Sequence, residues 1–123
     1  MTENLIEDYF LDKPISRAIF QEISNFISGL GNFDMSISKQ ISFGVKRKFL
    51  WFWLYNVTQK DPNGTPHLMI RLDEHHEDPH IRQTEQISKN RWNHQIIVSS
   101  LEQAQSAWLR KLIQKAYEFA SKP

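Results

Sequence analysis

Apolar residues follow a helical spacing near both ends of the chain and a strand-like spacing in its middle. Between residues 14 and 30 they recur every three or four positions, which is typical of the buried face of an amphipathic helix. Asp12 stands just before this stretch, where its carboxylate is able to cap the helix. The same spacing returns after Ser100, with Gln103 as capping-box partner, and predicts a helix that runs to about Ala120.

Between the helices, apolar and polar residues alternate, which indicates half-buried β-strands. A tight turn at residues 38–40 separates the first two strands. The segment 81–90 is ambiguous. We therefore expect about five strands, at residues 33–37, 41–45, 49–56, 67–72 and 91–100.

The order of these elements predicts the fold class. Consecutive strands with short connections favour an antiparallel sheet. With a helix at each end of the chain, we expect an α+β fold of two layers, in which the N- and C-terminal helices pack on one face of the sheet. We expect residues 1–123 to form a single domain. The second face of such a sheet is able to face water.

The stretch KFLWFWLY, from Lys48 to Tyr55, does not alternate, because seven apolar or aromatic residues follow the lysine. The aliphatic-rich half of its side chains suits packing beneath the helices. Two interpretations remain for the aromatic half: a core face covered by a loop from Asp73 to Asn90, or a floor that receives a ligand or a partner. Strand geometry places Phe49, Trp51, Trp53 and Tyr55 on one face and Leu50, Phe52 and Leu54 on the other.

The composition excludes several classes of function. The 123 residues include no cysteine, which rules out disulfides, thiol catalysis and thiolate metal sites. The longest apolar run is far shorter than the about 20 residues that a transmembrane helix needs, and no secretory signal is evident. We therefore expect a cytoplasmic protein without a membrane partner. The formal net charge of +1 gives no global field that would indicate nucleic acid.

Basic residues are nonetheless concentrated around the aromatic strand. No acidic residue occurs between Met35 and Lys60. Trp51 and Trp53 are able to stack on bases while the neighbouring cations contact phosphates. The alternative is a solvated hairpin end whose lysines protect a strand edge. The basic residues in this stretch are Lys39, Lys46, Arg47, Lys48 and Lys60.

Two polar residues in other strands are further candidates. His94 falls on the same side of its strand as Trp92 and the apolar residues that follow, so it is either a hydrogen-bonded core residue or a general base or ligand contact. Arg71 has the opposite parity to the apolar residues of its strand. This parity favours a position beside Trp51 and Trp53, where a cation–π contact would form.

Motifs for chemistry are missing from the sequence. The segment DEHHEDPH holds three histidines among four carboxylates, but its spacing matches no zinc motif, and we interpret it as a polar loop without a metal site. There is no nucleophile elbow, phosphate-binding loop or dinucleotide fingerprint. We therefore expect no cofactor and no catalytic residue, and a binding role is favoured over an enzyme.

Four stretches taken in order are informative together: ISKQISFGVKRKFLWFWL, EDPHIRQTEQIS, NRWNHQIIVSS and AWLRKLIQKAYEFA. In this order they resemble the bacterial family known as domain of unknown function 5655. The resemblance implies a cytoplasmic accessory domain without an established activity. Gln95 stands where relatives often carry a second histidine, which argues against a two-histidine site. The family pattern points to Lys39, Phe43, Pro79, Ile81, Trp92 and His94.

Three functions are consistent with these features. The first is a non-catalytic binding module whose aromatic and basic sheet face receives a nucleic acid or a protein segment. The second is a small-molecule pocket, with or without catalysis, around His94 and the tryptophans. The third is a structural homodimer or larger homo-oligomer that buries the aromatic face against a second copy. The candidate binding residues are Lys39, Trp51, Trp53, Arg71, Trp92 and His94.

Overall fold

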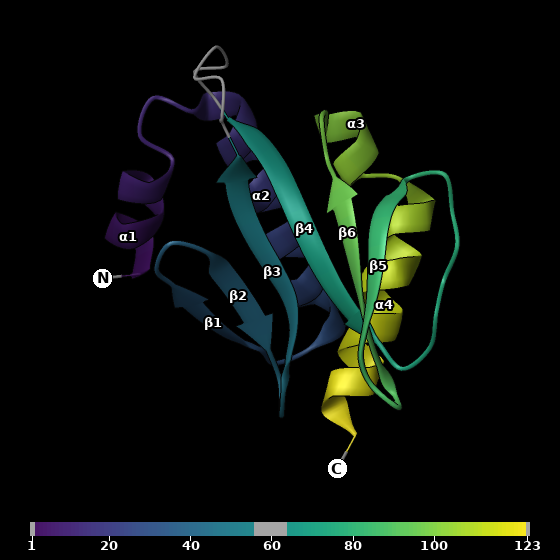
Figure 1. Cartoon of the computed structure of the whole chain (residues 1–123). Coiled ribbons are helices and arrows are strands. Elements are labelled where there is room, and N and C mark those ends of the chain that lie inside the picture. Colours follow the sequence, from purple (N-terminus) through teal and green to yellow (C-terminus); the bar gives the residue numbers. More distant parts are fainter. Residues whose placement is uncertain (1, 56–63, 123) are drawn as a thin grey trace.

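A six-stranded sheet and four helices make up the part of the chain that the structure describes (Figure 1). The computed structural model describes residues 2–55 and 64–122. The helices are α1 (Thr2–Tyr9), α2 (Pro14–Leu30), α3 (Leu101–Ala104) and α4 (Ala107–Ser121). The strands are β1 (Asp34–Ile37), β2 (Ile41–Gly44), β3 (Lys48–Tyr55), β4 (Thr65–Leu72), β5 (Ile81–Ser88) and β6 (Arg91–Ile97).

The strands pair in the order β1-β2-β3-β4-β6-β5, and every neighbouring pair is antiparallel. In Figure 1, α2, α3 and α4 lie behind the sheet and α1 lies to one side, so no helix crosses the face turned toward the viewer. The predicted α+β class, with its antiparallel sheet and terminal helices, is confirmed.

The expected number of strands was one too low, because the ambiguous segment 81–90 contains β5. This strand pairs only with β6, at one edge of the sheet. Most of its side chains are exposed, including Ile87. An edge strand of this kind lacks the regular burial of every second side chain from which a half-buried strand is recognised.

The first predicted helix is confirmed as α2, but its expected cap is wrong. Lys13, not Asp12, occupies the N-cap position, and no side chain caps the helix. Asp12 has a φ of 59°, in the left-handed region, because the chain turns sharply there between α1 and α2. The Lys13 amide closes this turn by donating to the Phe10 carbonyl oxygen. Pro14 then begins the helix, where its missing N–H costs nothing.

The single helix expected after Ser100 is divided in two. Half of the predicted capping box forms, since the Gln103 amide donates to the Ser100 side chain, but the Gln103 side-chain oxygen accepts from the Ser99 amide and not from that of Ser100. The short α3 ends after Ala104, however, and the Ser106 hydroxyl accepts from the Leu109 amide to start α4. A serine that can cap a new helix offers the backbone a local alternative to continuing the old one.

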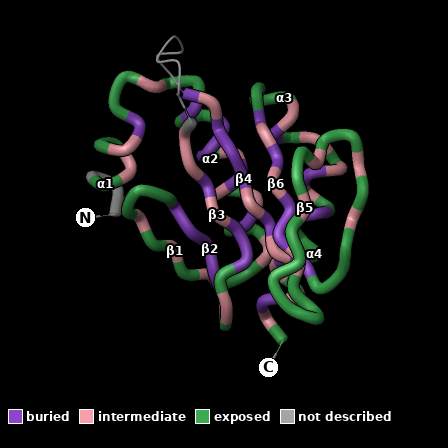
Figure 2. The backbone as a smooth tube through the Cα atoms, in the orientation of Figure 1, coloured by how far each residue is buried: buried purple, intermediate pink, exposed green. Residues whose placement is uncertain are grey.

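The apolar core lies between the sheet and the helices, where Figure 2 shows buried segments on the strands and on α2 and α4. Phe20 of α2 packs at its centre, with its ring centroid 5.4 Å from that of Phe52 and 6.0 Å from that of Phe43. Phe10, just after α1, closes the end of this cluster against Phe20 and Phe52. The expected placement of the Leu50 and Phe52 set beneath the helices is confirmed.

Phe49 departs from the expected alternation, because β3 bulges at this residue. Gly44 of β2 pairs with Lys48 and Phe43 pairs with Leu50, so Phe49 has no partner on β2. A bulge puts two successive side chains on nearly the same side of the sheet. Phe49 is consequently buried against Tyr117 of α4, with a ring-centroid distance of 5.8 Å, and does not lie with Trp51.

Among the described residues, no helix is both long enough and apolar enough to cross a membrane.

Candidate binding face

The helix-free face of the sheet carries a continuous set of side chains, which we call the open face. Residues that pair across antiparallel strands point to the same side. One such row crosses all six strands: Ser36, Ser42, Trp51, Met69, Gln95 and Gln83. On either side of it lie two shorter rows, Trp53–His67–Ile97 and Arg71–Asn93–Glu85. The open face therefore combines two tryptophans with one arginine and several amide or carboxylate side chains.

Arg71 lies over Trp51, as the parity of its strand predicted. Its guanidinium carbon is 4.8 Å from the indole centroid, which is a cation–π contact. The Arg71 Nε donates to the Asn93 Oδ1 at 3.0 Å and so fixes the orientation of the guanidinium. Burial lowers the pKa of Arg71, and the charge of Arg91 lowers it further. An arginine nevertheless keeps its charge at neutral pH, so the open face presents a held cation.

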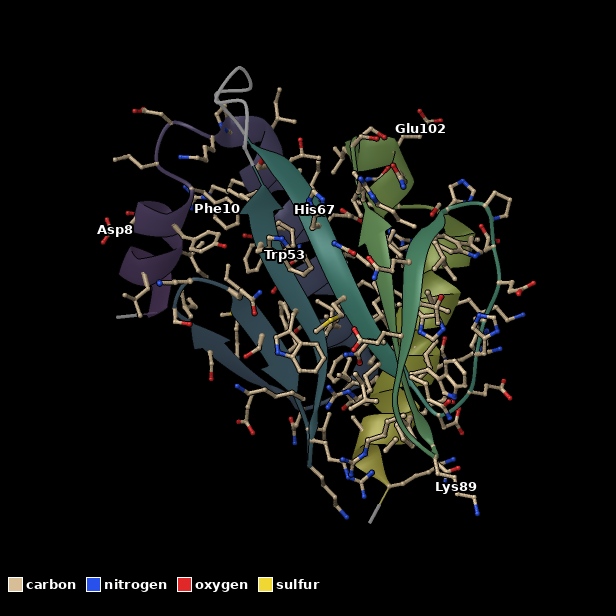
Figure 3. All side chains as sticks on the ribbon, in the orientation of Figure 1. Asp8, Phe10, Trp53, His67, Lys89 and Glu102 are labelled. Atoms are coloured by element: carbon tan, nitrogen blue, oxygen red, sulfur yellow. The ribbon has the colours of Figure 1, made fainter. Side chains whose placement is uncertain are left out.

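Trp53 stacks on His67, and Figure 3 shows the two side chains together on the open face. Their ring centroids are 5.5 Å apart and the ring planes differ by 28°. His67 is itself buried, and its Nδ1 lies 2.9 Å from the Thr65 carbonyl oxygen. The histidine therefore holds the indole in place while Trp53 stays partly exposed.

A shallow hollow of about 230 Å³ opens beside Trp53. This volume lies below the about 300–1,000 Å³ of pockets that enclose a whole drug-sized ligand or cofactor. The volume of the hollow is a better match for a single planar ring system or one side chain. The wall offers an apolar surface next to amide and carboxylate groups that both donate and accept hydrogen bonds. The hollow is lined by Trp53, Met69, Gln83, Glu85, Asn93 and Gln95.

The structure places His94 and Trp92 on the opposite, helix-facing side of the sheet. Asn93, between them, points to the open face. His94 has no exposed surface, and it lies in line with Ile96 of the core. The expected grouping of His94 with Trp51 and Trp53 is therefore not formed, and a ligand pocket around His94 has no exposed histidine to use.

The segment after β4 covers His94 rather than the tryptophans of β3. The His76 amide donates to His94 Nε2 at 3.0 Å. The His75 ring centroid is 5.2 Å from the ring of Trp92. The interpretation in which residues 73–90 cover the aromatic face is therefore wrong: the first part of this segment lies on the other face, and the second part is β5 at the sheet edge.

The predicted basic residues are spread over two places. Lys39 lies exposed in the β1–β2 turn, where its carbonyl oxygen accepts from the Tyr9 hydroxyl at 3.0 Å. Lys46 and Arg47 form the β2–β3 turn at the other end of these strands. Lys60 lies outside the described residues, as does the side chain of Tyr55. The structure therefore does not bring Lys39 together with Arg71.

The histidine-rich loop forms local pairs instead of a metal site. His80 Nδ1 and Asp78 Oδ1 are 2.6 Å apart, and the same oxygen accepts from the His80 amide. These hydrogen bonds lower the pKa of the Asp78 carboxyl. The His80 ring also packs on Trp108 of α4, with centroids 4.8 Å apart. No group of three potential metal ligands occurs within residues 2–55 and 64–122.

Sequence reasoning missed most of the residues that line the hollow. Met69 shares the parity of Arg71 on β4, so that signal was available. Asn93 and Gln95 alternate with His94 along β6. They were missed because the predicted binding face included His94 and therefore the opposite side of this strand. Gln83 and Glu85 could not be assigned to a face of the sheet from the sequence, because the segment that carries them was not recognised as a strand.

The comparison with protein families identifies the domain to which this sequence belongs. The family model described as Domain of unknown function (DUF5655) matches residues 6–120. The chain belongs to this family. The match covers nearly the whole chain and includes every strand of the sheet, so the open face lies within the DUF5655 domain. No curated protein and no solved structure matches the chain.

Proposed function

We propose that this DUF5655 protein is a non-catalytic binding module that receives single-stranded nucleic acid on its open face. The observation that carries the proposal is the pair Trp51 and Trp53, partly exposed on a helix-free sheet beside the cation of Arg71. Aromatic side chains on an open sheet are a stacking platform for unpaired bases, and each stacked base contributes about 1–3 kcal/mol. We place the module in the bacterial cytoplasm, since a chain without cysteine suits a reducing compartment.

The hollow beside Trp53 gives the stacked base its hydrogen-bonding partners. The amides of Gln83 and Gln95 both donate and accept, so they are able to pair with the edge of any base. Glu85 accepts only, and therefore favours bases that carry an amino group. Its negative charge also keeps phosphates out of the hollow. Bases are thus directed toward the sheet and the backbone toward the cations around it.

The test is an equilibrium titration of a fluorescently labelled single-stranded oligonucleotide, followed by anisotropy. We expect Trp53→Ala to weaken binding by roughly fivefold or more, which corresponds to the loss of one stacked base. Binding should also weaken with salt, with a slope of log affinity against log salt of about −0.7 for each phosphate contacted. Trp108→Ala on α4 is the matched control, because this partly buried tryptophan lies on the helix side.

Two results of this titration would contradict the proposal. One is the absence of binding at low salt, and the other is an equal loss of affinity in Trp53→Ala and Trp108→Ala. If sedimentation at high protein concentration instead shows a dimer that Trp51→Ala and Trp53→Ala dissociate, the open face is a surface for self-association, and the nucleic-acid proposal fails.

A further inference from the structure

Three segments that are distant in the sequence meet at one end of the molecule and enclose a second hollow. They are the β2–β3 turn, the β5–β6 turn and the end of α4, close to the Lys89 label in Figure 3. The hollow has a volume of about 430 Å³. We call it the basic hollow, and its lining residues are Arg47, Ser88, Lys89, Asn90, Arg91, Phe119 and Lys122.

Four of these lining residues are cations, and none is acidic. In the described part of the chain, one lysine or arginine side chain forms an ion pair: Arg110 pairs with Glu22, far from this end. None of the lining residues is a carboxylate that would offset the mutual repulsion of these cations. Their field reaches the open face, because the charge of Arg91 lowers the pKa of Arg71.

Local contacts hold the β2–β3 turn and its Arg47 against the end of α4. The Val45 amide donates to the Arg47 carbonyl oxygen at 3.0 Å, which closes the β2–β3 turn. The Lys46 amide donates to the carbonyl oxygen of Ala120 and ties this turn to α4. The Arg47 guanidinium lies 6.0 Å from the Phe119 ring centroid. The carboxyl end of a helix carries only about half a negative charge, which does not neutralise four cations.

We propose that the basic hollow is a binding site for linked phosphate groups, distinct from the hollow beside Trp53. Arginine offers a planar fork that matches phosphate oxygens, and lysine adds a point charge. Ser88 at the end of β5 and Asn90 in the β5–β6 turn supply a hydroxyl and an amide that are able to donate to the same oxygens. The site stands on its own geometry and does not require the open face to bind bases.

The same phosphate chemistry has two sources. One is the backbone of a nucleic-acid strand that continues from the open face, and the other is a free polyphosphate. Inorganic tripolyphosphate is therefore the probe, and its binding is measured by calorimetry and by backbone amide shifts. We expect the shifts to fall on the two turns and the end of α4. We expect Arg47→Gln combined with Arg91→Gln to weaken binding about tenfold or more, because two charge-assisted hydrogen-bonding groups are lost.

The matched control is Arg17→Gln combined with Lys115→Gln, which removes two exposed cations from α2 and α4 and changes the net charge equally. It should leave tripolyphosphate binding within about twofold, since surface charges act weakly at a distance in salt. Circular dichroism melting curves establish that both double variants fold. Equal losses in the two double variants, or no detectable binding of tripolyphosphate, would overturn the proposal.

Two further arms separate the sources and the two proposals. If an oligonucleotide displaces tripolyphosphate and Arg47→Gln with Arg91→Gln weakens oligonucleotide binding as well, the ligand is a strand backbone. If tripolyphosphate binds and the oligonucleotide does not compete, the ligand is a free polyphosphate. In either case Trp53→Ala should keep its tripolyphosphate affinity. Loss of oligonucleotide binding with retained tripolyphosphate binding would contradict the proposed function and leave this site standing.

Discussion

His94 is a buried histidine whose surroundings require it to be neutral. Its Nε2 accepts the His76 amide at 3.0 Å, so the ring proton is on Nδ1, which lies 3.3 Å from the Ile70 carbonyl oxygen. Burial lowers the pKa of His94, and the nearby charges of His76 and His75 lower it further. The histidine thus connects the loop after β4 to the sheet, which explains its place in the core better than a catalytic role does.

This geometry predicts an acid-sensitive free energy of unfolding. A histidine whose folded pKa is depressed stabilises the fold fully above its unfolded pKa of 6.5, and this contribution is lost as the pH falls from 6.5 through the folded pKa. The loss has an upper limit of about 1.4 kcal/mol per pH unit for one proton. We expect urea unfolding at about pH 7.5 and about pH 5.5 to show it.

His94→Gln is the informative variant for this prediction, because an amide is able to accept and donate but does not titrate in this range. Its free energy of unfolding should change less over the same pH interval than that of the original chain. His80→Gln is the matched control, since His80 is exposed. An unchanged pH dependence in His94→Gln would show that other groups are responsible.

At the scale of elements, the sequence predicted regular structure well where the pattern of burial was regular. Helix α2 has the predicted bounds, because one side of it is buried along its length. Strand β5 was ambiguous because most of its side chains are exposed at the sheet edge. The break between α3 and α4 depends on whether Ser106 caps or continues a helix, and the apolar spacing alone does not decide this.

The bulge in β3 predicts that replacing Phe49 costs more stability than replacing Trp51. Regular alternation would place both side chains on the same face and predict no such difference. Phe49 is fully buried against α4, so Phe49→Ala should lower the free energy of unfolding by about 3–5 kcal/mol. Trp51 is larger but partly exposed on the open face, so Trp51→Ala should cost clearly less than Phe49→Ala. Urea unfolding of the two variants measures both values. Equal costs, or a larger cost for Trp51→Ala, would contradict the bulged strand.

At the scale of the whole molecule, the sheet separates two kinds of chemistry. The helix-facing side holds the core and the neutral His94, and the open face holds Trp51, Trp53 and Arg71. Sequence parity was sufficient to place Trp51 and Arg71 together, because both strands alternate regularly at these residues. Parity was not sufficient to decide on which face of the sheet Trp92 and His94 lie. A shift of one residue in the register of a strand moves all its side chains to the other face, and the sequence does not give the register of β6.

The basic hollow was also beyond sequence reasoning, for a different reason. Arg47 belonged to the recognised basic cluster, but Lys89 lies in the turn after the ambiguous β5, Arg91 begins β6, and Lys122 lies at the end of α4. Only the closing of the antiparallel sheet brings these segments to the same end of the molecule. Their shared charge is a property of the fold and not of any single stretch of sequence.

The most direct test of the open face is the response of the four tryptophan indole N–H signals in a nitrogen-15 spectrum as a single-stranded oligonucleotide is added. Trp51 and Trp53 lie on the open face, whereas Trp92 and Trp108 lie with the histidine-rich loop on the other side. We predict that the indole signals of Trp51 and Trp53 shift with the ligand and that those of Trp92 and Trp108 stay in place. Shifts confined to Trp92 and Trp108, or no shift in any indole signal at low salt, would contradict a binding function for this face.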